Sequence, residues 1–425
     1  MNPTTSWHGC LMRVGRWPGL LAVAVLLAAC GGGDGGGDSP QQASSQQGAP
    51  ISADLAARSE QRIKGAVSVL GSGGYMSVRG EPDAVQVRHY DANGRPEAPK
   101  TRLDMNAVPG GQLGSITALA QGGYVLTWLG PSPNPSARWD ADYPLIVQRY
   151  AASGAFLGAE QVGVTQPFSQ RFPPPALPQV AALPDGGYVL AWAQYADAGF
   201  NLYARRYAAD GLPAGLAQRV TDSVVGPLNV VASAGGGYLL AWGYTSIFAR
   251  AYGPDDTALG PVQAVGSRSV SAGLPADQRT GLAALAGGGA VVTWADERSG
   301  LYVHARRLAT DGAPLGEAFI VDGSTLASPG LAPQTASSVA GMPDGGYVVA
   351  WLGPDGAIYG RRFAADGSPL GSVTRLNKAA SDALGPTVGA SGSGFAVTWN
   401  APAPSGGTIA YIRFFDASGL LGAAS

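Results

Sequence analysis

Charge is scarce in this chain, and its two signs nearly balance. Charged residues make up 13% of the 425 residues, about half of the roughly 25% that is usual for a globular domain. The formal net charge is −2. A nucleic-acid-binding protein needs a basic stripe to neutralise phosphates, so this balance excludes a strong nucleic-acid binder.

Cysteine and histidine are almost absent, which leaves little for metal or nucleophilic chemistry. The cysteines are Cys10 and Cys30, and the histidines are His8, His89 and His304. A zinc site or a Ser-His-Asp triad needs such residues in clusters, and no H-E-x-x-H, G-x-S-x-G or P-loop motif occurs. We therefore expect no metal, no cofactor and no catalytic residues.

Acidic residues leave one enzymatic alternative open. A glycosidase that uses only carboxylates needs two acids on one wall of a pocket. Solvated loop charge is the simpler interpretation of the acids here, and the turns offer fewer oxygens than calcium needs. The acids that we expect in loops are Asp140, Asp142, Asp296, Glu297 and Asp355.

No hydrophobic run is long enough to span a bilayer. Residues 20–27 follow Arg13 and Arg16 and are far shorter than the about twenty residues that a membrane helix needs. They fit the apolar part of a signal peptide. Residues 27–30 read LAAC, which resembles the bacterial lipobox, where the chain is cut before a cysteine that becomes acylated. The resemblance implies a signal peptide over residues 1–29 and a lipid anchor on Cys30.

Two details of the leader bear on its cleavage and its destination. Ordinary cleavage near Ala29 with an unmodified cysteine is the alternative to lipidation. Gly31 follows the cysteine, and the absence of Asp at this place favours the outer membrane of a Gram-negative bacterium over the inner one. Met12 is an alternative start, because residues 12–29 alone make a well-proportioned signal.

Composition indicates a folded all-β domain over residues 50–425. The chain has 64 glycines and 32 prolines, which interrupt helices and exclude a helical bundle. It also has 45% hydrophobic residues and 9 tryptophans, which a disordered chain lacks. Residues 30–49 are, by contrast, a flexible Gly/Ser/Gln tether behind Cys30. With Cys30 acylated, the mature domain has no disulfide.

A short motif recurs along residues 50–425. A pair of small residues, usually two glycines, precedes an aromatic residue, and four residues later comes Trp. The period of about fifty residues is typical of solenoids and propellers. The residues that follow the small pair are Tyr75, Tyr124, Tyr188, Tyr238, Ala290, Tyr347 and Phe395. The later positions hold Arg79, Trp128, Trp192, Trp242, Trp294, Trp351 and Trp399.

Each copy of the motif reads as four short strands. In the third copy, three strands are expected over residues 180–183, 188–192 and 202–207, with tight Asp-Gly turns after the first and third. Seven such units predict a seven-bladed β-propeller with four antiparallel strands per blade. A right-handed β-helix is the main alternative, but its coils are shorter. The seventh copy lacks a fourth strand, and we expect residues 50–56 to supply it and close the ring.

The repeats resemble those of a known group of proteins. Segments 186–211 and 345–371 match the pattern GGYVVTW…IYARRFDADGxPLG, which occurs as propeller blades in large secreted bacterial proteins. They are also similar to the delta-60 bacterial repeat in their PDG turn. The resemblance implies a propeller fold and a location at the cell surface, and it implies no catalytic residues.

Arg recurs on the third strand of the copies, with Gln148 in the second. We expect a structural role, in which Arg stacks on the strand-two Trp and donates to backbone carbonyls. A ring of cationic sites for an anionic glycan is the alternative. The recurring residues are Arg88, Arg205, Arg250, Arg306, Arg361 and Arg413.

Loops that differ between copies indicate a binding surface. The two–three and four–one loops of a blade lie on one face, here called the variable-loop face, and the remaining turns lie on the tight-turn face. Exposed aromatic and charged residues in such loops mark contact sites, although long loops also tolerate sequence drift. The candidate ligand-binding residues are Arg138, Trp139, Asp140, Tyr143, Phe168, Arg171, Phe172, Tyr195 and Phe200.

These features predict a binding or scaffold propeller of the cell envelope. We expect a monomer that is held to the membrane by acyl chains on Cys30, with a protein or glycan partner. A propeller hydrolase or lyase that acts on envelope polysaccharide is the alternative, although the scarcity of His and of clustered acids argues against an enzyme. A structural component without a ligand is a third interpretation.

Overall fold

The described part of the chain consists of strands and turns. It contains no helix, and so none that is long and apolar enough to cross a membrane. All of it belongs to the compact unit Gln46–Ser425. The computed structural model describes residues 66–69, 74–80, 84–97, 99–104, 112–129, 143–165, 177–196, 199–222, 226–268, 280–296, 301–324, 335–377, 384–392, 394–402 and 408–416.

Seven antiparallel sheets follow one another along the chain, and each is a blade whose strands pair in chain order. Blade one contains β1 (Ala66–Val69), β2 (Tyr75–Gly80), β3 (Ala84–Tyr90) and β4 (Thr101–Asp104). Blade two contains β5 (Gln112–Ala118), β6 (Tyr124–Leu129), β7 (Tyr143–Tyr150) and β8 (Phe156–Thr165). Blade three contains β9 (Gln179–Ala182), β10 (Tyr188–Ala196), β11 (Gly199–Tyr207) and β12 (Gln218–Thr221).

The remaining blades repeat this order. Blade four contains β13 (Leu228–Ala232), β14 (Tyr238–Trp242), β15 (Ser246–Tyr252) and β16 (Gln263–Ser267). Blade five contains β17 (Gly281–Ala284), β18 (Ala290–Asp296), β19 (Tyr302–Leu308) and β20 (Pro314–Ile320). Blade six contains β21 (Thr335–Gly341), β22 (Tyr347–Leu352), β23 (Ile358–Phe363) and β24 (Pro369–Arg375). Blade seven contains β25 (Leu384–Ser391), β26 (Gly394–Pro402) and β27 (Thr408–Asp416).

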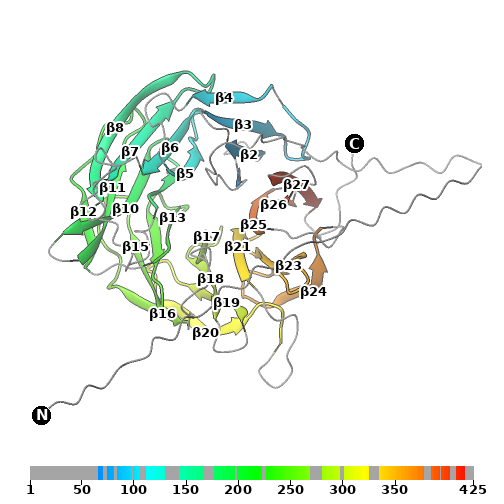
Figure 1. Cartoon of the computed structure of the whole chain (residues 1–425). Helices are drawn as coiled ribbons and strands as arrows, with labels where there is room; N and C mark the ends of the chain where they lie inside the picture. The colour runs from blue at the N-terminus through cyan, green and yellow to red at the C-terminus, as the bar shows by residue number, and fades with distance from the viewer. Residues whose placement is uncertain are drawn as a thin grey trace, which may run out of the picture. The chain divides into compact units, whose positions relative to one another are not determined.

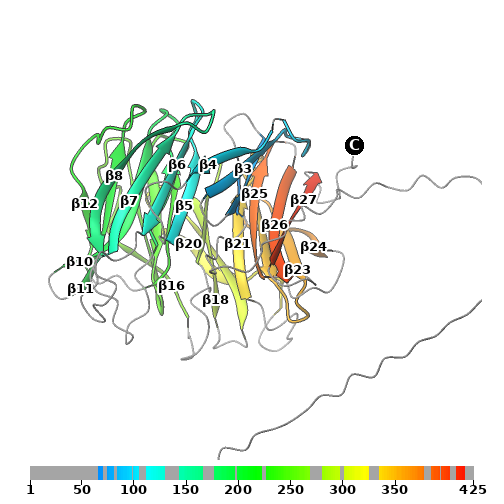
Figure 2. The same cartoon turned by 45° about the horizontal axis from the view of Figure 1, so that its top comes forward.

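The blades stand in a ring around a central axis, so the predicted seven-bladed propeller is confirmed (Figures 1 and 2). The first strand of each blade lies innermost, and β25 of the last blade contacts β1 of the first, which closes the ring. The predicted closing strand 50–56 lies outside the described residues, as do the signal peptide, Cys30 and the tether.

The second strand of each blade forms the core. All six residues of β6 (YVLTWL) are buried, because each face of a blade packs against a neighbouring blade. Aromatic rings pair across strands two and three, where they lie directly opposite each other. Tyr188 stacks on Tyr207 at 4.7 Å between ring centroids, and Trp192 stacks on Tyr203 at 5.8 Å.

Tight turns join strands one to two and three to four on one face of the ring. In blades two to six, each of these turns closes with a backbone hydrogen bond from its fourth residue to its first, such as Gly186 N to Leu183 O at 3.1 Å. The fourth residue needs a positive φ, which Gly adopts without strain, and Gly186 has φ 88°. In blade four Asp256 holds this place with φ 62°, since Asp is among the side chains that tolerate it best.

The repeated Arg of strand three ties each of blades four to seven to the blade before it. In blade five, Arg306 donates from Nε to Gly316 O at 2.9 Å within its own blade and from Nη1 to Val265 O of blade four at 2.8 Å. Arg250, Arg361 and Arg413 reach the preceding blade in the same way. The expected bonds to backbone carbonyls are confirmed at these positions.

The expected stacking of this Arg on the strand-two Trp is wrong. The guanidinium lies 5.5 to 5.9 Å from the ring two residues further along its own strand, because side chains at i and i+2 share one face of a strand. In blades three to seven, Trp instead stacks on the ring opposite it on strand three. The Arg and ring pairs are Arg88 with Tyr90, Arg205 with Tyr207, Arg250 with Tyr252, Arg361 with Phe363 and Arg413 with Phe415.

Candidate functional site

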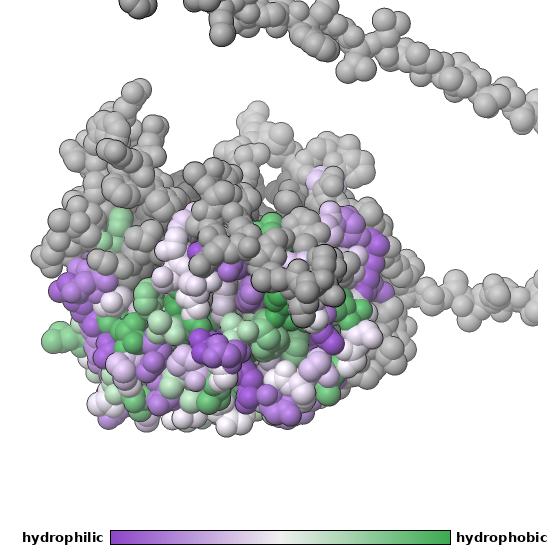
Figure 3. Space-filling view, turned by 90° about the horizontal axis from the view of Figure 1, so that it is seen from below, coloured by the Kyte–Doolittle hydropathy of each residue, from purple (hydrophilic) through white to green (hydrophobic). Residues whose placement is uncertain are grey.

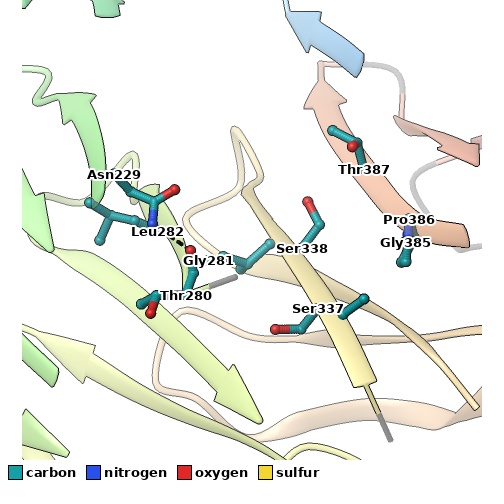
Figure 4. Close-up of a pocket in the computed structure, with 11 residues that line it drawn as sticks. Asn229, Thr280, Gly281, Leu282, Ser337, Ser338, Gly385, Pro386 and Thr387 are labelled. Carbon is teal, nitrogen blue, oxygen red and sulfur yellow. Dashed lines mark hydrogen bonds between the residues drawn. The ribbon is translucent and has the colours of Figure 1, made fainter. Parts of the chain in front are cut away.

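A cavity of about 160 Å³ lies at the propeller axis, among the first residues of four successive inner strands. Asn229 of β13, Gly281 of β17, Ser337 of β21 and Thr387 of β25 line it (Figure 4). These strands begin where the four–one connections end, so the cavity, here called the axial pocket, belongs to the variable-loop face. Four blades therefore contribute to one site.

Hydroxyl and amide groups of the axial pocket also join the blades to one another. The Asn229 side-chain amide donates to the carbonyl of Thr280, from blade four to blade five. The hydroxyls of Thr293 and Ser337 lie 3.0 Å apart between blades five and six. Ser338 Oγ accepts a hydrogen bond from Val388 N at 3.1 Å. The polar groups are thus held in place before any ligand arrives.

One polar atom of the pocket has no hydrogen-bond partner among the described residues. Thr280 is fully buried, and its Oγ1 has no hydrogen-bond partner in the described part of the protein. The adjoining Gly281 cannot carry a side chain, because a Cβ there would overlap Thr293 Oγ1. A buried hydroxyl without a partner is costly unless water or a ligand satisfies it.

The described residues that line the axial pocket include no ionisable side chain. They are Asn, Thr, Ser, Gly, Ala, Pro, Leu and Val, which can donate and accept hydrogen bonds but cannot transfer a proton near neutral pH. The geometry therefore suits the binding of a neutral, hydrogen-bonding ligand. It offers neither an activated nucleophile nor a general base.

Ionisable residues gather elsewhere on the variable-loop face, at blades four and five. Arg268 follows β16, is 2% exposed, and donates to the carbonyls of Tyr244 and Gly243. Burial lowers the pKa of Arg268, and the nearby negative charge of Asp296 opposes this shift. Burial also lowers the pKa of His304, again opposed by Asp296. These three residues, here called the Arg268 cluster, interact electrostatically.

The two histidines lie apart, as the sequence suggests. His89 Nε2 is 2.7 Å from the Tyr124 hydroxyl, at the boundary of blades one and two. His304 stacks on Trp294 at 5.8 Å in blade five. Within the described ranges, no three His, Cys, Asp or Glu side chains lie close enough to hold a metal ion.

Most of the residues predicted to bind a ligand lie outside the described part of the chain. These are Arg138, Trp139, Asp140, Phe168, Arg171 and Phe172. The other three are in strands and not in loops: Tyr143 begins β7, while Tyr195 of β10 pairs with Phe200 of β11. The β10–β11 ladder continues beyond this pair to Ala196 and Gly199. Phe200 is partly buried.

Sequence reasoning missed the residues of the axial pocket. They lie at or near the start of the first strand of a blade, where the sequence predicted no contact with a ligand. The signal that distinguishes them is a polar residue near the start of such a strand, as with Asn229, Thr280 and Ser337. Arg268 was missed because it stands outside the repeated pattern.

Comparison with known proteins defines the fold. No protein-family model matches the chain, and no curated protein matches its sequence. The polysaccharide lyase Uly1 is similar in structure, with a TM-score of 0.51 and 11% identity over 88% of this chain and 94% of the lyase. A structure from a study of two prolyl endopeptidases has a TM-score of 0.50 and 14% identity over 84% of this chain. This chain spans 47% of that endopeptidase's length. At such identities the likeness concerns the fold, and the chain is a β-propeller of seven blades.

Proposed function

We propose that the protein is a lipid-anchored binding propeller of the bacterial cell envelope, which recognises a protein or glycan partner through its variable-loop face. The lipobox-like residues 27–30 support the anchor on Cys30, and Gly31 supports the outer membrane. The tether of residues 30–49 gives the propeller reach from the bilayer. The protein acts as a monomer, because one ring of blades completes the fold.

The axial pocket is the observation that supports binding. It joins four blades on the variable-loop face and is lined by neutral hydroxyl and amide groups. Neutral donors and acceptors match the hydroxyls of a glycan better than a charged group, which would lack a counter-charge there. Of the two partner classes, the pocket favours the glycan.

A glycan array probed with the full lipoprotein in detergent tests this function. We expect retention of one class of neutral or weakly charged glycan without turnover. Thr387→Val removes a pocket hydroxyl at nearly constant shape and should weaken retention about tenfold, the effect of roughly one hydrogen bond. Thr374→Val on the outer strand β24 is the matched control and should bind like the parent protein.

The residues that the sequence predicts to bind a ligand can be tested in the same assay. Trp139→Ala, Tyr143→Ala and Arg171→Ala together should abolish retention with little loss of stability, because none belongs to the motif that recurs in every copy. Retention that survives both the triple variant and Thr387→Val would place the ligand elsewhere. A large fall in stability would show that the loops are packed parts of the fold.

A hydrolase or lyase that acts on envelope polysaccharide is the second candidate. The Arg268 cluster supports it, because buried charges of opposite sign beside a histidine on the variable-loop face are typical of acid–base sites. Incubation with envelope polysaccharides distinguishes the two functions. Shortened chains, or unsaturated ends in the case of a lyase, would favour the enzyme if His304→Gln removes them. Binding without products favours the receptor.

A further inference from the structure

The interface between two neighbouring blades is here called a joint. The side chains packed at the joint between blades four and five differ from those at the other six joints. At each joint we compare two positions. One is the residue after the strand-three Arg position, and the other is the residue after the small pair, which is the first residue of strand two in the next blade or, in β26, the second. The residue after the strand-three Arg position has the same register in the pairing of strands two and three of every blade. In chain order the pairs are His89 and Tyr124, Arg149 and Tyr188, Arg206 and Tyr238, Ala251 and Ala290, Arg307 and Tyr347, Arg362 and Phe395, and Phe414 and Tyr75.

Large side chains fill this place at the other joints. Between blades three and four, the Arg206 guanidinium lies 5.8 Å from the centre of the Tyr238 ring and donates to Gly236 O at 3.1 Å. Between blades seven and one, the Phe414 ring lies 5.4 Å from that of Tyr75. Six of seven joints thus contain a ring, and one contains two alanines.

A groove of about 220 Å³ lies at this joint on the tight-turn face, where the small side chain of Ala251 leaves room for it. Ala251, Tyr252 and Leu259 line it from blade four, and Gly289 and Thr310 line it from blade five. No charged side chain lines the groove. Because Pro254 and Thr310 at its mouth are exposed, the groove is open to solvent.

An exposed apolar side chain lines the groove, because Leu259 is 49% exposed. All large apolar side chains that are exposed in the described part of the chain lie between a three–four turn and the second residue of the following outer strand. Figure 3, which views the side where β16 and β20 lie, shows such residues among hydrophilic ones. A groove beside an exposed apolar side chain is typical of a site that binds an anchor residue of a protein partner.

We propose that this groove binds an aromatic side chain presented by a protein partner. The groove is continuous with the packed interface between blades four and five. This interface lacks the aromatic ring that the other joints contain. Phe414 shows that a ring alone fills the first position at one of them. An arginine from a partner fits less well. Arg206 is paired with Asp256 at 2.9 Å, and the corresponding turn residue of blade five is Gly312.

Small analogues of the missing ring test the proposal on the full chain. p-Cresol and the capped peptide Gly-Tyr-Gly are titrated while backbone amide shifts are followed by NMR. We expect saturable binding that moves the amides of Ala251 and Thr310. Ala290→Tyr restores the ring found at other joints and should weaken binding at least tenfold while leaving Tm equal or higher. Ala365→Tyr, at an exposed turn of blade six on the same face, is the control and should bind normally.

Ala251→Arg supplies a second filled groove in case Ala290→Tyr does not fold, and it should also block binding. Equal affinity in the parent protein and the filled variants would overturn the proposal, as would shifts confined to other amides or no saturation at millimolar probe. Tighter binding of Gly-Arg-Gly than of Gly-Tyr-Gly would overturn the choice of an aromatic occupant. The result does not depend on whether the variable-loop face binds a ligand, because the groove lies on the opposite face.

Discussion

The Ser391 hydroxyl donates a buried hydrogen bond of 2.9 Å to the hydroxyl of Tyr75, a residue 316 positions earlier in the chain. Beside it, Phe414 packs its ring against Tyr75 and Tyr90, at 5.4 and 5.3 Å between centroids. Blade seven is therefore joined to blade one by side chains as well as by the contact of β25 with β1. At the two positions compared above, no other joint combines a Phe with a Tyr as Phe414 and Tyr75 do.

Removal of this ring should loosen the closure. Phe414→Ala deletes a partly buried aromatic side chain, and we expect about 2–3 kcal/mol less stability, near the low end for Phe→Ala. Ser391→Ala should cost about 1 kcal/mol through one hydrogen bond. Urea unfolding followed by Trp fluorescence measures both. Equal stability of Phe414→Ala and the parent protein would show that closure does not depend on this contact.

The Arg that links neighbouring blades gives a second prediction. Arg306→Met keeps the apolar stem but loses the hydrogen bonds to Gly316 O and Val265 O. We expect a loss of about 2 kcal/mol, because two carbonyls lose a charged donor. Arg102→Met breaks an exposed ion pair with Asp104 and is the control, with an expected change below about 0.5 kcal/mol. Similar changes for the two variants in urea titration would contradict the interblade role.

Two neighbouring glycines should respond differently to the same substitution. A Cβ on Gly237 would overlap the Tyr252 carbonyl, whereas a Cβ on Gly235 meets nothing within 4 Å. Gly237→Ala should therefore lower Tm by several degrees, since a clash with backbone costs on the order of 2 kcal/mol. Gly235→Ala should leave Tm nearly unchanged. Differential scanning calorimetry of both variants checks this, and a reversed order would be inconsistent with the turn geometry.

Acid should weaken the fold through His304. Burial lowers the pKa of His304 in the folded state below its ordinary value of 6.5, so the unfolded chain binds the proton more tightly. The contribution of His304 to stability is present above about pH 6.5 and is lost as the pH falls toward its lower folded pKa. His304→Gln should show a shallower fall in stability than the parent protein from pH 7 to pH 5. Parallel curves in urea titrations would contradict this assignment.

Anchoring is predicted to depend on one atom, the sulfur of Cys30. Cys30→Ser should move the protein from the membrane fraction to the periplasm or the medium, because acyl chains supply its membrane affinity. Fractionation with immunoblotting measures the distribution, and mass spectrometry of the mature N-terminus measures the lipid. An unmodified Cys30 in the mature parent protein would refute the anchor.

The blades could be predicted from the sequence because their signals are local and repeated. Glycine pairs, the residues after them and the Asp-Gly turns each describe a few adjacent positions, and repetition made the pattern readable. The partner of the strand-three Arg could not be predicted in the same way. Arg306 reaches Val265, which is 41 positions away, and such a contact depends on how two blades pack.

The candidate site was harder to predict because it is assembled across blades. Asn229, Thr280 and Ser337 stand in three different repeats, and nothing in one repeat shows that their strands meet at the axis. The face that the sequence predicts for ligand binding is also the face of this pocket, and its role in binding stays a prediction. The sequence showed no sign of the groove beside Ala251, which is recognised only when each joint is compared with the others.

The carbonyls that accept from Arg250, Arg306, Arg361 and Arg413 across the joints belong to the backbone, and every residue type supplies one. A blade that is copied or exchanged within the gene consequently finds its docking points already present on whichever neighbour it meets. Duplication of such a unit requires no matching change in the adjoining copy, and later substitutions there leave the link intact. This property allows the number and order of units to vary during evolution while the ring still assembles.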